Sequence, residues 1–483
     1  MNRDDALARL RSELFDVLIV GGGATGLGCA LDAATRGYAT ALVEAHDFAK
    51  ATSSRSTKLV HGGVRYLAQG NIGLVREALL ERSRLHANAP ALVRELRFLV
   101  PAYAWSELLY YAAGLKLYDV LARGSHFSSS IVLDARGARQ RIPVLKRSGL
   151  RGAILFSDAQ FVDTRLAIAI ARTAFDSGAA LANYVRAESF LFDGKRVAGA
   201  HAVDLESGER FTIRARAVVN AAGIFVDAVR ANEGLNAAPL LTYSRGSHIV
   251  VGGEPLGDTQ TALLVPRTAD GRVLFAIPWQ GFTLIGTTDV PAPAPEIEPH
   301  PSAAEIEYIL ATVNGYLGRA IARRDVLTAF AGIRPLVNRR AARTANLSRE
   351  HVVDVSNAGL VTIAGGKWTT YRKMAQDAID AAAKAGGLSQ AACVTARLRL
   401  HVDEIAQGTQ DGAVRNAARF EMARTVEDVL ARRLGSLFVD ARAARSKAGA
   451  VAQVLASELG RDAAWQADQL REFEALALEY EVD

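Results

Sequence analysis

A glycine cluster that follows an apolar run constrains this chain more than any other feature of its sequence. The run, residues 17–20, predicts a short buried strand. It leads at once into Gly21, Gly23 and Gly26, a G-x-G-x-x-G spacing, and residues 27–36 then predict a helix. A strand, a tight glycine turn and a helix in this order predict the first part of a dinucleotide-binding unit.

The rest of that unit follows directly. A second apolar run, residues 39–43, ends at Glu44, an acid placed to accept hydrogen bonds from ribose hydroxyls. Gly21 permits the tight turn, Gly23 lets backbone N–H groups approach a pyrophosphate, and Gly26 lets the helix pack on the strand. An acid at this position favours a free ribose, as in FAD or NAD, and a unit so near the N-terminus suits FAD-dependent enzymes.

The composition describes a large globular protein with a basic balance. The chain has 483 residues, 50% of them hydrophobic and 22% charged, so it can bury the cores of two or three domains. Its net charge is +6 and its pI about 9.3. Nucleic acid, anionic lipid, a phosphorylated substrate or simple arginine richness could each explain this charge. Because no block of five like charges is present, a nucleic-acid tail is not expected.

Cysteine usage and hydropathy bear on the compartment. Two scattered cysteines, Cys29 and Cys393, give no disulfide framework, which fits a reducing compartment. Residues 1–14 are charged, so we expect no signal peptide. The most apolar helical candidate, residues 105–122, contains three charged residues and is not expected to cross a membrane. It predicts a helix packed on the core, and the alternative is a helix lying on a membrane surface.

The segment after the dinucleotide unit is unusually polar. Residues 51–67, ATSSRSTKLVHGGVRYL, are dense in hydroxyls, glycine and cations, which can donate many hydrogen bonds to phosphate, ribose and a flavin ring. Residues 72–89 and 163–177 predict helices, and the turn signals at 193–194 and 207–208 predict a set of hairpin strands.

The second half of the chain contains strand patterns first and helical patterns later. Residues 218–223, VVNAAG, predict a strand that returns to the dinucleotide sheet, and residues 243–288 are rich in strand patterns. A glycine turn at 365–366 then opens a predicted helix over 369–384, whose N-terminal N–H groups suit a partly negative flavin edge. From about 390 onward strand patterns cease, which predicts a separate helical domain.

Taken together, these motifs resemble those of one family, the FAD-dependent glycerol-3-phosphate dehydrogenases of the respiratory type. The matching segments cover most of residues 15–385, and a C-terminal stretch also resembles that family's helical cap. They are GGGATGLGCALDAATRG, ATSSRSTKLVHGGVRYL, RGSHIVV, IPWQGFTLIGTTD, AGIRPLV, LSREH, AGGKWTTYRKMA and EMARTVEDVLARRLGSLFVDARAA.

The resemblance implies an α/β fold of the glutathione-reductase and D-amino-acid-oxidase type, with an FAD-binding Rossmann-like domain, a β-rich substrate domain and a C-terminal helical cap. The first part of the FAD-binding domain is expected at 1–90 and the cap at 390–483. Residues 91–385 are expected to interleave the substrate domain with returning FAD-binding segments at about 150–225 and 325–385.

The implied activity is oxidation of sn-glycerol 3-phosphate to dihydroxyacetone phosphate by hydride transfer to FAD, with electrons passed to a membrane quinone. A cytoplasmic enzyme, peripheral on the inner face of the cytoplasmic membrane, is expected. Further partners considered are an anionic lipid surface and a second copy of the chain, with no nucleic acid and no metal. The alternatives are a glycerol-3-phosphate oxidase that uses oxygen, an amino-acid oxidase of the same fold, and an FAD-holding scaffold in RNA modification.

The resemblance also assigns roles to residues of the quoted motifs. A base must take the C2 hydroxyl proton, and His61 and His248 both remain candidates because histidine titrates near neutrality. The other catalytic candidates are Arg334 and Lys367. The substrate-binding candidates are Arg65, Tyr66, Thr287, Arg334 and Arg349. The cofactor-binding candidates are Gly21, Gly23, Gly26, Glu44, Thr52, Ser53, Ser54, Lys58, Leu59, Gly223 and Gly366.

Overall fold

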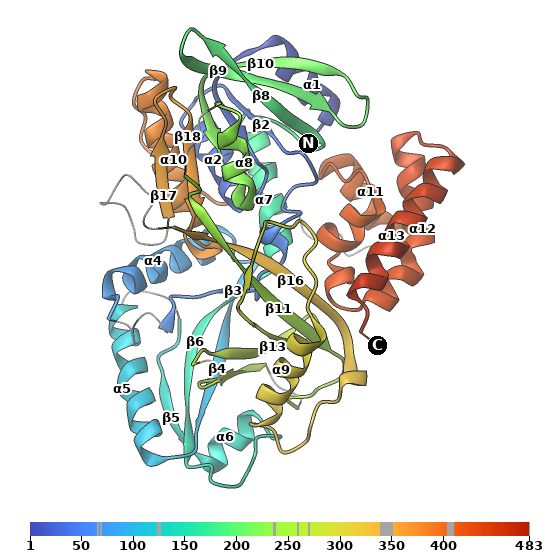
Figure 1. Ribbon diagram of the computed structural model, residues 1–483. Helices are drawn as coiled ribbons and strands as arrows, with labels where there is room; N and C mark the ends of the chain where they lie inside the picture. Colours follow the sequence, from blue (N-terminus) through green and yellow to red (C-terminus); the bar gives the residue numbers. More distant parts are fainter. Residues whose placement is uncertain are drawn as a thin grey trace.

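Two mixed β-sheets, one above the other in Figure 1, form the frame of the molecule, and the C-terminal helices lie beside them. The structure is a computed structural model that describes residues 1–64, 67, 70–122, 127–234, 238–257, 260–268, 271–338, 351–402 and 410–482. Among its described helices, none combines the length and the apolar character needed to cross a bilayer.

The upper sheet is built around the strand that precedes the glycine turn. Its order is β17-β18-β10-β1-β2-β7, with the hairpin β8–β9 joined to β10, and β1 is parallel to both of its neighbours. Its strands are β1 (Leu14–Val20), β2 (Thr40–Val43), β7 (Ala180–Ala182), β8 (Val185–Asp193), β9 (Arg196–Asp204), β10 (Arg210–Asn220), β17 (His351–Val355) and β18 (Val361–Gly365).

Both faces of this sheet are covered, as the apolar composition of its central strands requires. Val17 and Ile19 face a core shared with α2 (Ala24–Thr35), α7 (Asp163–Asp176) and α10 (Tyr371–Gly386). Alternate residues of the same strand face a second core that includes α1 (Arg3–Ser12), β8 and β9. The helix over residues 3–12 was not predicted, and Asn2 caps it.

The lower sheet is the larger one within the described residues. Its order is β15-β11-β14-β13-β12-β4-β6-β3, with β16 paired to β11 and β5 paired to β6. Its strands are β3 (Leu59–Val60), β4 (Val93–Ala102), β5 (Ile131–Asp134), β6 (Gly152–Phe161), β11 (Leu241–Val251), β12 (Thr261–Val265), β13 (Leu274–Trp279), β14 (Phe282–Gly286), β15 (Val290–Ala292) and β16 (Val326–Val337).

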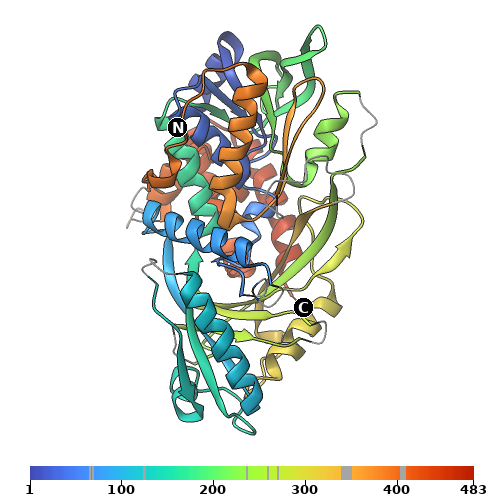
Figure 2. The ribbon, with the colours of Figure 1, turned by 90° about the vertical axis from the view of Figure 1, so that its left-hand side faces the viewer.

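Helices flank this sheet and connect it to the upper one. Figure 1 shows α5 running down one side of the sheet, and Figure 2, turned by 90°, shows α4 crossing between the two sheets. These helices are α4 (Ile72–Asn88), α5 (Trp105–Leu121), α6 (Ala135–Arg141) and α9 (Ala303–Asn314), whereas α8 (Val226–Ala231) packs on β10 and β18 of the upper sheet. The long strands β11 and β16 extend toward the upper sheet, and Leu241 and Val337 at their ends pack in one cluster with Ala364 of β18.

The C-terminal part is helical. It comprises α11 (Gln410–Phe420), a π-helix (Asp428–Arg433), α12 (Ala441–Leu459) and α13 (Ala463–Tyr480). Phe438, Val451 and Phe473 share one hydrophobic core with Phe330 of β16, so these helices are packed firmly on the lower sheet. The predicted fold class is confirmed.

The assignment of segments to sheets differs from the predicted boundaries at two places. Strand β6 lies within the predicted returning segment 150–225, and β16 lies within 325–385, yet both belong to the lower sheet. Strand periodicity indicates which face of a strand is buried but not which sheet supplies its hydrogen-bonding partner. The ranges proposed for the three domains stay a prediction.

Candidate functional site

The first glycine turn leaves no room for side chains. Gly21 has φ +113°, and a Cβ there would lie 2.6 Å from the carbonyl oxygen of Ala221 at the end of β10. A Cβ on Gly26 would lie 1.9 Å from the carbonyl oxygen of Gly21. Helix α2 begins at Ala24, and its N-cap Gly23 offers no capping side chain. The turn therefore presents bare backbone at a helix N-terminus, which suits a pyrophosphate.

Glu44 closes this turn on the side of the second strand. Its carboxylate accepts hydrogen bonds from the N–H groups of Gly22 at 2.5 Å and His46 at 2.8 Å. Burial raises the pKa of Glu44, and these two donors oppose that effect. A carboxylate with two oxygens has further lone pairs that ribose hydroxyls could use, and the role of Glu44 in cofactor binding stays a prediction.

Ser53 connects the first glycine turn to the second. Its hydroxyl accepts a hydrogen bond from the N–H of Ala24 at 3.0 Å, and its carbonyl oxygen accepts one from Trp368 Nε1 at 2.8 Å. Gly365 and Gly366 both have φ +78°, and a Cβ on Gly366 would lie 2.2 Å from Met374 Sδ. Two segments more than 300 residues apart thus meet at one serine.

Other predicted cofactor residues differ in how they relate to this cradle. Gly223 has φ +59° and follows Ala221 and Ala222, the residues after β10 that lie against Gly21. Thr52 Oγ1 donates to the carbonyl oxygen of Ile333 at 2.7 Å, and the Ser54 hydroxyl is buried and donates within its own loop. Leu59 packs into the core of the lower sheet. The Thr52 and Ser54 hydroxyls are therefore engaged within the protein, and their role in cofactor binding stays a prediction.

Lys58 was predicted to contact the cofactor, but its ammonium group forms a buried ion pair with Asp163. Its Nζ lies 2.8 Å from both carboxylate oxygens of Asp163 and donates to the carbonyl oxygen of Ser54 at 2.7 Å. It is also 5.0 Å from the ring centroid of Phe438. The side chain is fully buried, so in this structure it anchors the loop to α7. Asp163 was not recognised from the sequence because nothing marks it apart from its place at the helix start.

The pairing of β11 with β16 assembles a second constellation. Gly246 lies opposite Gly332, His248 opposite Phe330, and Ser244 opposite Arg334. A Cβ on Gly246 would lie 2.1 Å from Arg334 Nη2, so this glycine makes the space that the guanidinium occupies.

Arg334 is held by the segment that follows β14. Its Nη2 donates to Thr287 Oγ1 at 2.9 Å, and Nη1 and Nη2 donate to the carbonyl oxygen of Thr288 at 3.2 and 3.1 Å. A carboxylate oxygen of Asp289 lies 3.5 Å away. The side chain is about one-third exposed, so it remains accessible to an anion. Two predicted substrate residues, Thr287 and Arg334, are thereby in direct contact.

His248 lies two residues along β11 from the glycine that makes room for Arg334. Its ring stacks on Phe330 with centroids 5.0 Å apart, and its Nε2 is 2.9 Å from Thr57 Oγ1. Its Nδ1 has no hydrogen-bond partner among the described residues. Burial, together with the charges of Arg334 and Lys58, lowers the pKa of His248 well below its usual range. The imidazole is therefore neutral and able to accept a proton. Thr57 was missed as an individual residue although it lies inside a quoted motif.

His61, the other candidate base, lies near the second glycine turn. Its carbonyl oxygen is 3.5 Å from Thr369 Oγ1. Loss of hydration around the ring lowers its pKa to about 4, an effect opposed by Asp158 and reinforced by Lys367. Lys367 is the N-cap of the short helix Trp368–Thr370. Arg65, Tyr66 and Arg349 lie outside the described residues.

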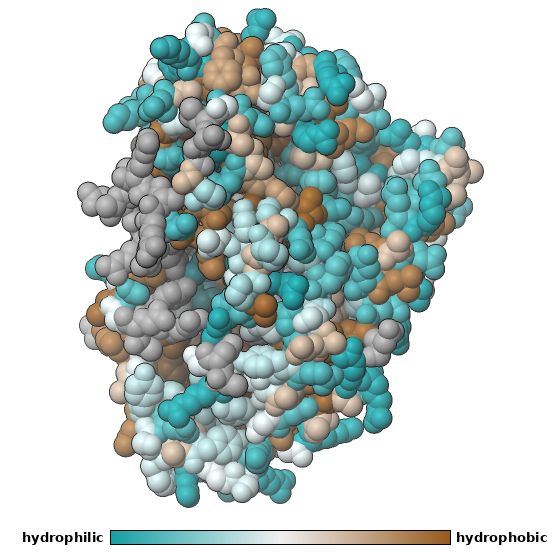
Figure 3. All heavy atoms as spheres, in the orientation of Figure 1, coloured by the Kyte–Doolittle hydropathy of each residue, from teal (hydrophilic) through white to brown (hydrophobic). Residues whose placement is uncertain are grey.

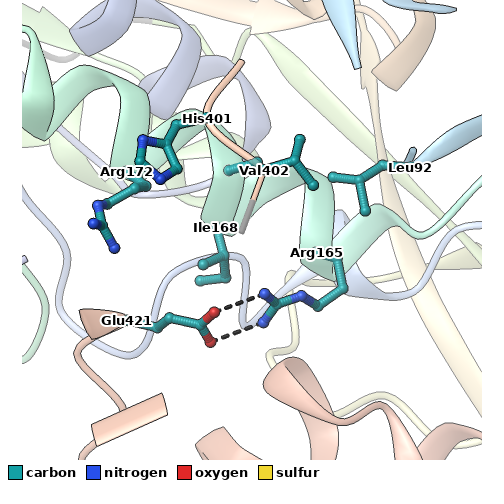
Figure 4. A pocket seen from close by; sticks show the side chains of 8 residues that line it. Leu92, Arg165, Ile168, Arg172, His401, Val402 and Glu421 are labelled. Atoms are coloured by element: carbon teal, nitrogen blue, oxygen red, sulfur yellow. Dashed lines mark hydrogen bonds and ion pairs between the residues drawn. The ribbon is translucent and has the colours of Figure 1, made fainter. Parts of the chain in front are cut away.

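A small pocket beside α7 lies apart from the predicted site residues. Figure 4 shows it between α7 and the segment that leads to the C-terminal helices, with Arg165 and Glu421 joined by hydrogen bonds of 2.6 and 2.8 Å. None of the predicted site residues lines it. Its paired charges indicate a structural contact between two parts of the chain.

Comparison with known proteins gives concordant results. The chain is 48% identical over 386 residues to the mitochondrial glycerol-3-phosphate dehydrogenase of Mus musculus, a stretch covering 77% of this chain. It is 45% identical over 442 residues to the Homo sapiens enzyme of the same name, covering 88% of this chain. The matches span 53% and 60%, respectively, of those longer proteins. The resemblance noted from the motifs is confirmed.

Two solved structures share the fold of this chain, one of them over nearly its whole length. The glycerol-3-phosphate dehydrogenase from Bacillus halodurans, complexed with FAD, matches with a TM-score of 0.80 and 29% identity, covering 99% of this chain and 97% of that one. L-alpha-glycerophosphate oxidase from Mycoplasma pneumoniae, with FAD bound, shares the fold with a TM-score of 0.62 and 16% identity, covering 80% of this chain and 99% of that one.

Two family models divide the chain between them. The model for the C-terminal domain of alpha-glycerophosphate oxidase matches residues 394–466, which lie within the helical C-terminal part. The model for FAD dependent oxidoreductases matches residues 16–372, which include both glycine turns and the Arg334 and His248 constellation. The chain therefore belongs to the FAD dependent oxidoreductase family.

Proposed function

We propose that this protein oxidises sn-glycerol 3-phosphate to dihydroxyacetone phosphate and passes the electrons to a membrane quinone. The observation that carries the proposal is the pair formed by an accessible guanidinium, Arg334, and a neutral buried imidazole, His248, on adjacent strands. The pair suits a substrate that combines a phosphate with an alcohol. The names of the relatives that share 45–48% identity with the chain support the same substrate.

Phosphate recognition is assigned to Arg334 first. A guanidinium can bind two phosphate oxygens at once, and its hydrogen bonds to Thr287 Oγ1 and the Thr288 carbonyl fix its plane in advance. Arg65, Tyr66 and Arg349 remain proposed further contacts. Since an arginine held in one orientation loses little conformational entropy on binding, this arrangement favours a compact dianion.

The backbone of both glycine turns, with Glu44 and Ser53, would hold FAD. When bound, FAD supplies the acceptor for the hydride that leaves C2 of the substrate. The chain itself must remove the proton of the C2 hydroxyl. His248 and His61 are both neutral near pH 7 because their pKa values are lowered, so either ring can take that proton. Lys367 is proposed to stabilise negative charge beside His61.

A membrane location is also proposed, and the surface of α5 and β5 supports it. Trp105, Leu109 and Tyr110 are 63%, 71% and 62% exposed, and Val132 on the neighbouring β5 is 54% exposed. Figure 3 shows hydrophobic side chains among hydrophilic ones along the lower left edge, where Figure 1 shows α5. Exposed cations follow in the adjoining segment, at Arg136, Arg141, Lys146, Arg147 and Arg151. Apolar anchors flanked by cations suit an anionic bilayer surface, here the inner face of the cytoplasmic membrane.

The substrate is tested by flavin bleaching. Purified holoprotein is mixed anaerobically with sn-glycerol 3-phosphate, and in parallel with glycerol or lactate, while absorbance in the visible flavin band is recorded. Bleaching by the phosphorylated alcohol alone is expected. Equal bleaching by lactate, or none by any of the three, would contradict the proposal.

The acceptor and the membrane contact need separate tests. With substrate present, reduction of a short-chain quinone without hydrogen peroxide is expected; rapid peroxide release in air would favour the oxidase alternative. The protein is expected to cosediment with vesicles that contain phosphatidylglycerol. A Leu109→Ser, Tyr110→Ser double variant is expected to stay in the supernatant. A variant at Leu478, half exposed on α13, serves as the matched control.

A further inference from the structure

The loop of residues 46–58 carries several predicted cofactor residues but has little regular structure of its own. Its only described helical segment is a single 3-10 turn, Thr52–Ser54. Within it, Ser53 bonds both to Ala24 at the start of α2 and to Trp368 beside the second glycine turn. The shape of the loop therefore sets how the two halves of the cofactor cradle meet, and something outside the loop must fix that shape.

The N-terminal end of the loop is fixed by the π-helix of the C-terminal part. Asp47 is fully buried and accepts hydrogen bonds from Arg432 Nε at 2.5 Å and from Arg433 Nη1 and Nη2 at 2.7 and 2.8 Å. Burial alone would raise the pKa of Asp47, but the two guanidinium groups lower it well below its usual range. This carboxylate is thus ionised and held by two cations of one short helix.

A second contact at the same end completes a balanced network. Lys50 Nζ lies 2.7 Å from Glu427 Oε2, and Arg432 also donates to Glu427 at 2.6 Å and to Asp428 at 2.7 Å. The network pairs three cations with three carboxylates. Two of the six groups, Asp47 and Lys50, belong to the loop, and the other four belong to the C-terminal part. A buried network of this kind is costly to break at a single member, because the partner left behind remains charged.

The other end of the loop, where Lys58 is paired with Asp163 of α7, is also held by the last helix. Arg55 is buried and its Nη2 donates to Tyr480 Oη at 2.9 Å, while the same nitrogen pairs with Glu298. The guanidinium lies 5.7 Å from the ring centroid of Phe438. Arg55 Nη1 also donates to the carbonyl oxygen of Ala51 at 3.1 Å, so the side chain folds the loop back on itself.

We infer that the C-terminal helical part holds the 46–58 loop in the conformation that FAD binding requires, and that Arg432, Arg433 and Tyr480 are positioning residues for the cofactor. They contact the loop at its two ends and touch neither glycine turn. Preorganisation of a binding loop raises affinity by removing the cost of ordering it on binding. The inference rests on the FAD dependence of the family and is independent of the proposed substrate.

The test compares FAD affinity in variants that release the loop with a variant that weakens the same domain contact elsewhere. Asp47→Asn removes the charge at one end, and Tyr480→Phe removes the hydroxyl at the other. The matched control is Glu206→Gln, because Glu206 pairs with Arg424 and Arg461 of the C-terminal part and touches no loop residue. Each protein is stripped of flavin and titrated with FAD by flavin fluorescence, and its thermal unfolding is followed without FAD.

We expect Asp47→Asn to raise the FAD dissociation constant about ten-fold or more and Tyr480→Phe about three-fold. Glu206→Gln is expected to change the FAD dissociation constant less than about two-fold. This should hold even if the unfolding midpoint of Glu206→Gln falls as far as that of Asp47→Asn. A purely structural role would make affinity follow the midpoint in all three variants. At saturating FAD, the visible flavin spectrum of the loop variants should match that of the wild type.

Two results would overturn the inference: an unchanged FAD dissociation constant in both loop variants, or an equal increase in Glu206→Gln. Should Asp47→Asn fail to fold, Lys50→Met takes its place, since Lys50 contributes a single ion pair to Glu427 at the edge of the network. Its dissociation constant is then compared with that of Glu206→Gln by the same criteria.

Discussion

The two ends of the candidate site are built by opposite means. The dinucleotide end lies within residues 17–44 and consists mainly of backbone, with Gly21 and Gly26 leaving no space for a Cβ. The substrate end consists of side chains from four distant segments, with Thr57 hydrogen-bonded to His248 and Arg334 to Thr287. A site made of backbone depends on local conformation, whereas a site made of side chains depends on how strands pair. The two ends should therefore fail separately.

The largest expected effect tests the backbone end. In Gly26→Ala, the new Cβ meets the carbonyl oxygen of Gly21 at 1.9 Å, and since that atom is backbone the turn itself must shift. We expect FAD affinity to fall about 100-fold or more. Gly73→Ala is the matched control, because a Cβ there meets nothing within 4 Å. Fluorescence titration of apoprotein measures both, and unaltered affinity in Gly26→Ala would show that the turn does not approach the cofactor.

The next effect belongs to the substrate end. Arg334→Ala removes the guanidinium held by Thr287 and Thr288, so we expect the Michaelis constant for sn-glycerol 3-phosphate to rise roughly 100-fold with FAD still bound. Arg323→Ala, at a surface ion pair with Glu307, is the control and should change neither quantity. Steady-state kinetics with a soluble acceptor give the Michaelis constant, and an unchanged value would remove Arg334 from phosphate binding.

The contrast also explains what could be predicted from the sequence. Gly21, Gly26 and Glu44 were proposed directly, because the strand, turn, helix and second strand that carry them follow one another within residues 14–44. The contact of Arg334 with Thr287 needed β16 to pair with β11, and strand patterns do not specify partners. Arg334 and His248 were proposed only through the resemblance to a family.

Side chains that anchor the loop were the hardest to interpret. Lys58 was grouped with cofactor ligands because a lysine among hydroxyls suits a phosphate, yet it is paired with Asp163. The same chemistry that recognises a phosphate also forms a buried ion pair, and only tertiary structure distinguishes the two. Asp47 and Arg433, nearly 400 residues apart, gave no signal at all for the same reason.

A smaller effect at the dinucleotide end comes from Glu44. Glu44→Ala leaves the N–H groups of Gly22 and His46 without their acceptor, so we expect FAD affinity to fall about ten-fold. Glu44→Gln keeps one acceptor oxygen and should lose less. At saturating FAD the Michaelis constant should stay at the wild-type value; a rise like that in Arg334→Ala would mean that the two ends are not independent.

The smallest expected effect is a shift in the pH profile of kcat/KM. This shift distinguishes His248, at the substrate end, from His61, near the second glycine turn, as the base. Both histidines have lowered pKa values, so each stays neutral as the pH falls through the ordinary value of 6.5 and loses its basic form only at lower pH. The kcat/KM of the wild type should accordingly show no decline near pH 6.5, and its acid limb should lie lower. For His61, that limb is expected at about pH 4.

Removing a nearby cation separates the candidates. The charge of Arg334 lowers the pKa of His248, and the charge of Lys367 lowers that of His61. If His248 is the base, Arg334→Ala moves the acid limb of kcat/KM toward higher pH and Lys367→Met leaves it in place. If His61 is the base, Lys367→Met moves the limb toward higher pH and Arg334→Ala leaves it in place. A limb that neither substitution moves would count against both histidines, because the charge of the cation removed lowers the pKa of the histidine beside it in each case.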